Sequence, residues 1–131
     1  LYSIPERTVS MNGLQMLRIP KSKMAFYANL TKDALGGTVD YLLTYAWTDA
    51  INWDDSQLAL DTSPPFSRMD FKVNWTNNEE TLEVMAFLNN IQNKVGIRNM
   101  TSDGEQLAYQ RSVTPTLPRM AGIGFTYKFG N

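Results

Sequence analysis

Residues that commonly do catalytic chemistry are scarce in this 131-residue chain, which contains no cysteine and no histidine. These absences exclude disulfides, a cysteine nucleophile, a Ser-His-Asp triad and metal sites built from thiolate or imidazole. Two carboxylate pairs, Asp54-Asp55 and Glu79-Glu80, are adjacent in sequence, and neighbours on an extended strand point to opposite faces. We therefore interpret them as solvated loop charge rather than the facing carboxylates of a glycosidase. The sequence predicts no catalytic residue, no metal site, no cofactor and no enzymatic activity.

The best ligand-binding candidate is a short run that combines an aromatic ring with two carboxylates, namely Trp53, Asp54 and Asp55. Binding residues concentrate in loops, and this run lies in a segment rich in Asp, Ser and Pro. It does not match a calcium-binding loop, because the required glycine and terminal glutamate are missing. Two interpretations stay open: contact with an incoming ligand, or an ordinary surface loop.

The charge balance narrows the possible partners. The chain carries 12 basic and 13 acidic residues, for a formal net charge of −1. A nucleic-acid surface needs a basic stripe, so no nucleic-acid partner is expected. No apolar run reaches the roughly 18 residues of a transmembrane helix.

Five segments alternate apolar and polar residues with the period of two that is typical of β-strands. These segments are residues 23–31, 38–48, 68–76, 81–91 and 121–129. The alternation is weakest in 81–91, where a helix is also possible, because Met85 and Phe87 share a side with Glu83. Strands of roughly 9–11 residues match a tilted crossing of a bilayer and exceed the usual soluble strand.

The connections between these segments alternate in length. Short, polar connections at 32–37 and 77–80 alternate with long segments at 49–66 and 92–117. Transmembrane barrels show this asymmetry, with tight turns on one rim and long loops on the other.

The two sides of the predicted strands differ in composition. Tyrosine and tryptophan favour membrane interfaces, so the apolar side predicts a lipid-facing aromatic belt. Its members are Tyr41, Tyr45, Trp47, Trp75, Phe125, Tyr127 and Phe129. The polar side predicts lumen-facing residues, which are Arg68, Asp70, Lys72, Asn74 and Lys128. The alternation alone fits equally a soluble sheet whose rings form a core, and both interpretations stay open.

The order of these segments and their amino-acid motifs resemble the C-terminal end of the β-barrel of TonB-dependent outer-membrane receptors. Residues 18–24, Arg-Ile-Pro-Lys-Ser-Lys-Met, resemble the start of a late barrel strand, with Ser22 where the family often has histidine. Segments 40–48, 69–75, 82–91 and 118–129 resemble the following strands in the family's order. The chain ends Phe129-Gly130-Asn131, whereas outer-membrane proteins usually finish on an aromatic residue.

The resemblance implies an all-β fold: an antiparallel up-and-down meander of about five strands, the C-terminal strands of an incomplete transmembrane barrel. Barrels of this family have about 22 strands, so residues 1–131 would be a fragment. Residues 1–22 would be an outer loop or the end of a preceding strand, and 23–131 the last strands.

The resemblance also implies a function. The parent protein would import a scarce solute, such as a ferric siderophore, cobalamin or an oligosaccharide, across a bacterial outer membrane. Its partners would be outer-membrane lipid, the barrel assembly machinery reading the last strand, and TonB acting through a plug domain not present here. The alternative is a soluble β-sheet module that binds a ligand and packs its apolar faces on each other.

Overall fold

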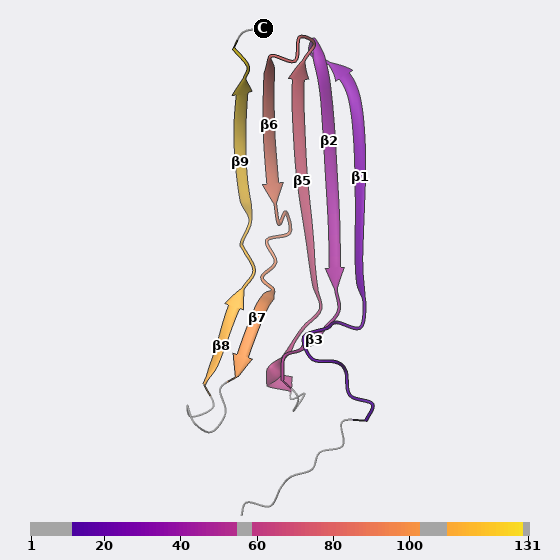
Figure 1. The fold of residues 1–131 in the computed structure, drawn as a ribbon, viewed down its shortest axis with the longest axis vertical. Helices are drawn as coiled ribbons and strands as arrows, with labels where there is room; N and C mark the ends of the chain where they lie inside the picture. Colours follow the sequence, from indigo (N-terminus) through magenta and orange to yellow (C-terminus); the bar gives the residue numbers. More distant parts are fainter. Residues whose placement is uncertain (1–11, 55–58, 103–109, 130–131) are drawn as a thin grey trace, which may run out of the picture.

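The computed structural model describes residues 12–54, 59–102 and 110–129, and its main feature is one antiparallel sheet (Figure 1). Five long strands lie in the order β1-β2-β5-β6-β9. Their bounds are Lys23–Ala34 for β1, Gly37–Thr48 for β2, Phe66–Asn77 for β5, Leu82–Asn89 for β6 and Met120–Tyr127 for β9. Successive long strands are also neighbours in the sheet, which confirms the predicted up-and-down meander.

Each of the five predicted segments forms a strand, and the predicted fold class is confirmed. Segment 81–91, for which a helix was possible, forms β6. The residues that weaken its alternation have unusual neighbours, because Phe87 pairs with Gly122 and Met85 with Gly124 on β9. A strand with large side chains on both sides is accommodated here because glycine leaves room across the ladder.

The β1–β2 connection is tighter than predicted. Residues 32–37 were expected to form the turn, but the strands continue to Ala34 and resume at Gly37. Leu35 and Gly36 alone make the turn, with φ of 55° and 69°. Two positive φ values are the signature of a type I′ hairpin, whose twist matches that of the flanking strands. Gly37 is also required, because a Cβ there would collide with the carbonyl oxygen of Thr76.

The β5–β6 connection agrees with the predicted turn at 77–80, except that Asn77 ends β5. The side chain of Asn77 holds this turn: its Oδ1 accepts from the Leu82 amide at 2.8 Å and its Nδ2 donates to Thr81 Oγ1 at 2.9 Å. Glu80 adopts a positive φ of 54°. Both tight turns lie at the same end of the sheet (Figure 1).

The long segments at the opposite end are more ordered than loops. The first contains β3 (Ile51–Asn52), a 3₁₀ helix η1 (Ala59–Asp61) and β4 (Thr62–Ser63), with β3 and β4 paired. The second contains β7 (Ile97–Ser102) and β8 (Arg111–Pro115), which pair as a hairpin. The predicted long connections are therefore present and contain short paired strands. In the described residues, no helix is long and apolar enough to cross a membrane.

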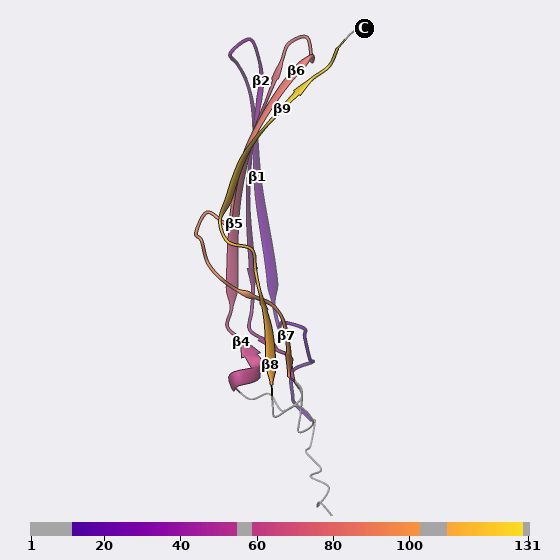
Figure 2. The ribbon, with the colours of Figure 1, turned by 90° about the vertical axis from the view of Figure 1, so that its left-hand side faces the viewer.

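The sheet is a single curved layer when seen from its edge (Figure 2). Within the described residues, the buried apolar side chains are only Val39 and Met100. A soluble domain of this size normally buries one apolar face against another layer. In the described part of the chain, both faces of the sheet are instead open to the surroundings.

Candidate functional site

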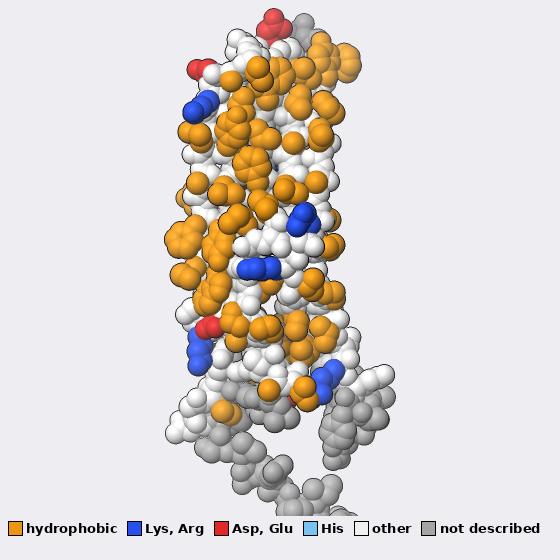
Figure 3. Space-filling model, turned by 180° about the vertical axis from the view of Figure 1, so that it is seen from behind, with side chains coloured by type: hydrophobic (Ala, Val, Ile, Leu, Met, Phe, Trp, Pro, Cys, Tyr) orange, Lys and Arg blue, Asp and Glu red, His pale blue; other side chains and the backbone are white. Residues whose placement is uncertain are grey.

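The first candidate surface is the apolar face of the sheet. Residues that pair across an antiparallel ladder point to the same side. The register therefore aligns apolar residues across the full sheet: one row reads Leu30, Tyr41, Val73, Ala86 and Ile123. Hydrophobic side chains cover most of this face, a few basic side chains lie among them, and acidic side chains lie only toward its two ends (Figure 3). The partition of residues between faces follows the sequence pattern.

Large side chains on the apolar face are strongly exposed. Phe125 is 75% exposed and Ile123 is 70% exposed, although both lie within β9. Such exposure over a continuous face exceeds the scattered apolar residues of an ordinary surface, so the face requires an external apolar partner.

The seven predicted belt residues fall on this face. Six are placed there by the register, and the ring of Phe129 contacts that of Tyr127 edge-on at 4.7 Å. Trp75 lies near the tight-turn end, where its Nε1 donates to the carbonyl oxygen of Ala34 at 3.3 Å. Trp47 lies near the other end of β2. Their contact with lipid stays a prediction.

The opposite face carries the predicted lumen residues. Arg68 and Asp70 form an ion pair, with Nε 2.8 Å from Oδ1. Lys72 is exposed and takes part in neither of the two ion pairs found among the described residues. Asn74 is half-buried, and its Oδ1 has no hydrogen-bond partner in the described part of the chain. Lys128 is exposed beyond β9, with its backbone amide bonded to Thr81.

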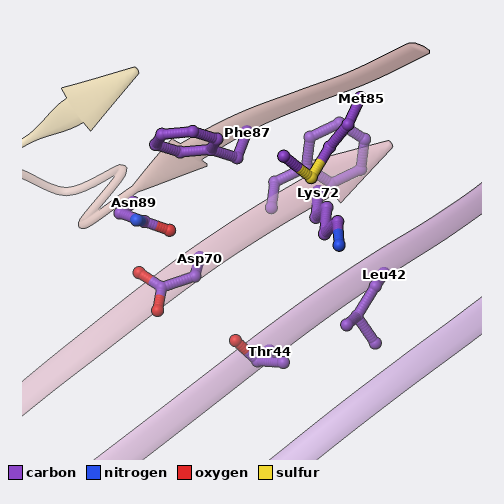
Figure 4. Close-up of a pocket in the computed structure, with 8 residues that line it drawn as sticks. Leu42, Thr44, Asp70, Lys72, Met85, Phe87 and Asn89 are labelled. Atoms are coloured by element: carbon purple, nitrogen blue, oxygen red, sulfur yellow. The ribbon is translucent and has the colours of Figure 1, made fainter. Parts of the chain in front are cut away.

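An apolar island interrupts this polar face. Met85 and Phe87, which weaken the alternation of segment 81–91, and Leu42 of β2 are brought by the register to the same side as Lys72. They line a hollow of about 300 Å³ together with Thr44, Asp70, Lys72 and Asn89 (Figure 4). The predicted lumen face is therefore amphipathic at this point rather than uniformly polar.

The structure describes only part of the predicted ligand-binding run, namely Trp53 and Asp54. Asp55 lies outside the described residues. Trp53 is half-buried, its backbone amide donates to the carbonyl oxygen of Asp61 at 2.9 Å, and its buried Nε1 has no partner in the described chain. Ligand contact by Trp53, Asp54 and Asp55 stays a prediction.

An ion pair that the sequence did not reveal joins the two long segments. Arg111 of β8 donates through Nε to Asp61 Oδ1 at 2.7 Å, and Asp61 of η1 is buried. This hydrogen bond, together with the charges of Asp61 and Asp54, raises the pKa of Arg111 above its ordinary value. The guanidinium therefore stays charged and can fasten the β7–β8 hairpin to η1.

A second unforeseen feature is the buried side chain of Asn90, which is 1% exposed and directly follows β6. Its Nδ2 donates to the carbonyl oxygens of Lys94 and Leu117, and its Oδ1 accepts from the Lys94 amide. Its backbone amide donates to Asp70 Oδ1 at 2.7 Å. Asn90 therefore connects Lys94 and Leu117, which lie before β7 and after β8, to Asp70 on the polar face of the sheet. Asn90 adopts a positive φ of 52°, a backbone conformation that asparagine tolerates.

The described residues contain no group of three or more acidic residues that could hold a metal ion. The described residues present an apolar face, a polar face with a hollow, and two short paired segments at one end of the sheet.

A one-layer antiparallel sheet with one apolar and one polar face has the composition of a β-barrel wall, and comparisons with known proteins agree on the fold. No protein-family model and no curated protein matches the chain. Among solved structures, the chain matches the crystal structure of the ferric yersiniabactin uptake receptor FyuA from Yersinia pestis, with a TM-score of 0.77 and 13% identity. The match covers 92% of this chain and 18% of that chain. At this identity the likeness shows the fold, and it confirms the resemblance to the barrel of TonB-dependent receptors.

Proposed function

We propose that this chain is a wall segment of a TonB-dependent transporter in a bacterial outer membrane. The observation that carries the proposal is the continuous, exposed apolar face that spans all five long strands. Lipid supplies the apolar partner that such a face needs, and backbone groups within the sheet are satisfied by neighbouring strands. The 12-residue strands β1, β2 and β5 are long enough for a tilted crossing.

The soluble-module alternative has less support. That alternative requires the apolar faces to pack on each other, and the described residues form one layer with few buried apolar side chains. The proposal gives the chain a role in transport and no catalytic role.

The likeness to a ferric siderophore uptake receptor favours a ferric siderophore as the solute. Cobalamin and oligosaccharides remain alternatives in the proposal. Energy would arrive from TonB through a plug domain elsewhere in the polypeptide, and the barrel assembly machinery would recognise β9 and Phe129.

Location is the first test. The intact gene product should sediment with outer membranes, resist carbonate extraction and dissolve only in detergent. A product that stays soluble and monodisperse without detergent would overturn the membrane assignment.

Uptake is the second test. Cells that lack the gene should lose growth on one ferric siderophore as sole iron source, and collapse of the proton-motive force should stop uptake in wild-type cells. Parallel assays with labelled cobalamin and oligosaccharides identify the solute class. Normal uptake of all three classes without the gene would refute the transport role.

A further inference from the structure

A lysine lies among the apolar side chains toward the long-connection end of the sheet. Ser67 of β5 pairs with Trp47 of β2, so the Ser67 hydroxyl is on the apolar face. Lys94, which follows β6, donates from Nζ to Ser67 Oγ at 2.7 Å. The ammonium group of Lys94 is therefore on the apolar face, at the level of Trp47 in the predicted aromatic belt.

The chain holds this ammonium group in place. Ser67 is 6% exposed, and its hydroxyl donates to Oε1 of Gln92 at 3.3 Å while it accepts from Lys94. The backbone of Lys94 is fixed by Asn90, which accepts from its amide and donates to its carbonyl oxygen. Lys94 is exposed, and its ammonium group keeps donors that no described residue accepts from. Those donors are available to a partner outside the described chain.

A second basic residue lies beside this lysine. Arg119 directly precedes β9, and its backbone amide donates to Oδ1 of Asn93, the residue before Lys94, at 3.1 Å. Ala121 pairs with Leu88 on the apolar face, and the alternation of β9 places Arg119, two residues earlier, on the same side. Figure 3 shows basic side chains over the middle of this face and acidic ones only toward its two ends.

These two positive charges are not compensated on the apolar face. Neither Lys94 nor Arg119 takes part in the ion pairs found among the described residues. Asp70, which accepts from the nearby Asn90 amide, belongs to the polar face and is paired with Arg68. Basic side chains next to apolar surface at a membrane interface suit a lipid with an anionic headgroup, because the headgroup and the acyl chains then both find partners.

We propose that Lys94 and Arg119 bind a phosphate group of an outer-leaflet lipid whose acyl chains extend along the apolar face past Leu43 and Phe71. Leu43 and Phe71 pair with each other and lie closer to the middle of the sheet than Ser67. The inference rests on the proposed function in one respect, because the transporter role places this face in lipid and the long connections outside the cell. It adds the chemical class of one bound lipid and its position.

Bound lipid is counted by native mass spectrometry on the intact gene product in mild detergent, with diphosphorylated lipid A as the probe and chemically dephosphorylated lipid A as its neutral counterpart. Lys94→Gln should bind one molecule of the diphosphorylated lipid fewer than wild type until its concentration is raised about tenfold, as expected for loss of a charge-assisted hydrogen bond. Lys94→Arg should bind as wild type does, and Arg119→Gln should resemble Lys94→Gln. The dephosphorylated lipid should not distinguish Lys94→Gln from wild type.

The matched control is Lys32→Gln, which removes the same charge from the same face at the tight-turn end, where Lys32 pairs with Val39. It should leave the lipid count unchanged. The proposal is overturned if wild type binds no diphosphorylated lipid A, if Lys94→Gln binds as many molecules as wild type at every concentration, or if Lys32→Gln loses one equally. Sedimentation with outer membranes is measured separately, so a protein that sediments normally but fails these tests refutes this lipid site and not the transporter role.

Discussion

Leu42 and Leu43 are adjacent on β2 and point to opposite faces of the sheet, and their surroundings differ in kind. Leu43 lies on the apolar face between Ala28 and Phe71. Leu42 lies on the polar face between Asn29 and Lys72. On the polar face, ion pairs and hydrogen bonds satisfy many groups within the chain, whereas the apolar face has to be completed by something outside it. The cost of a substitution should therefore depend on the face that the residue occupies as well as on the residue type.

The largest expected effect comes from placing a charge on each face in turn. If the apolar face meets lipid as proposed, Leu43→Lys should destabilise the protein in a bilayer by about 2–4 kcal/mol, because a lysine on a lipid-facing strand at mid-depth is costly. Leu42→Lys, on the face proposed to meet water, should cost far less, even though it places a second lysine opposite Lys72. Urea unfolding in lipid vesicles measures both. Equal losses would mean that the two faces do not differ in their surroundings.

The next largest loss of stability should follow from removing the side-chain amide of Asn90, whose hydrogen bonds are satisfied within the chain. Asn90→Ala should cost about 2–3 kcal/mol, because it leaves the backbone amide of Lys94 and the carbonyls of Lys94 and Leu117 without their side-chain partner. Asn89→Ala, at the neighbouring half-buried position, should cost much less. The same unfolding measurement applies, and faster proteolysis within 92–117 should accompany the loss only in Asn90→Ala. An equal loss at Asn89 would refute the anchoring role.

A smaller effect should follow from filling the space under Phe87. Gly122→Ala should destabilise by about 1–2 kcal/mol, since the ring has to leave its position over β9. Gly124→Ala should be nearly neutral, because the neighbouring Met85 methyl is flexible and lies in ordinary contact. If both variants unfold at the same urea concentration as wild type, Phe87 is not held by Gly122.

The smallest effect belongs to a residue on neither face. Leu35 has a positive φ in the β1–β2 turn and is 87% exposed. Leu35→Asn should stabilise the protein by about 0.5 kcal/mol, because asparagine tolerates this conformation better than leucine. A shift of the urea midpoint to higher concentration is the expected result. A lower midpoint would show that the leucine side chain makes a contact worth more than the strain.

The sequence predicted the faces well because strand alternation has a period of two. Once Val73 and Lys72 are known to share a strand, their opposite directions follow. The register could also be anticipated, since a shift by one residue would move an entire apolar row to the wrong side.

Features that depend on contacts between distant segments could not be predicted. Asp61 and Arg111 are 50 residues apart, with β5 and β6 of the long sheet and β7 of the second hairpin between them, and nothing near either residue indicates the other. The two-residue turn was missed because Leu35 stands where asparagine or glycine is usual. The hollow was missed because Met85 and Phe87 read as weak alternation until Gly122 and Gly124 lay beside them.

The alternation of tight and long connections also sets an order of assembly. The β1–β2 and β5–β6 hairpins each close over a few residues, whereas pairing β2 with β5, or β6 with β9, requires closure of a long segment. Loop-closure entropy favours the short closures, so the two hairpins should form first and then join edge to edge. Pulsed hydrogen exchange during refolding should protect amides between β1 and β2 before those between β2 and β5. The sheet would then grow as paired units rather than strand by strand.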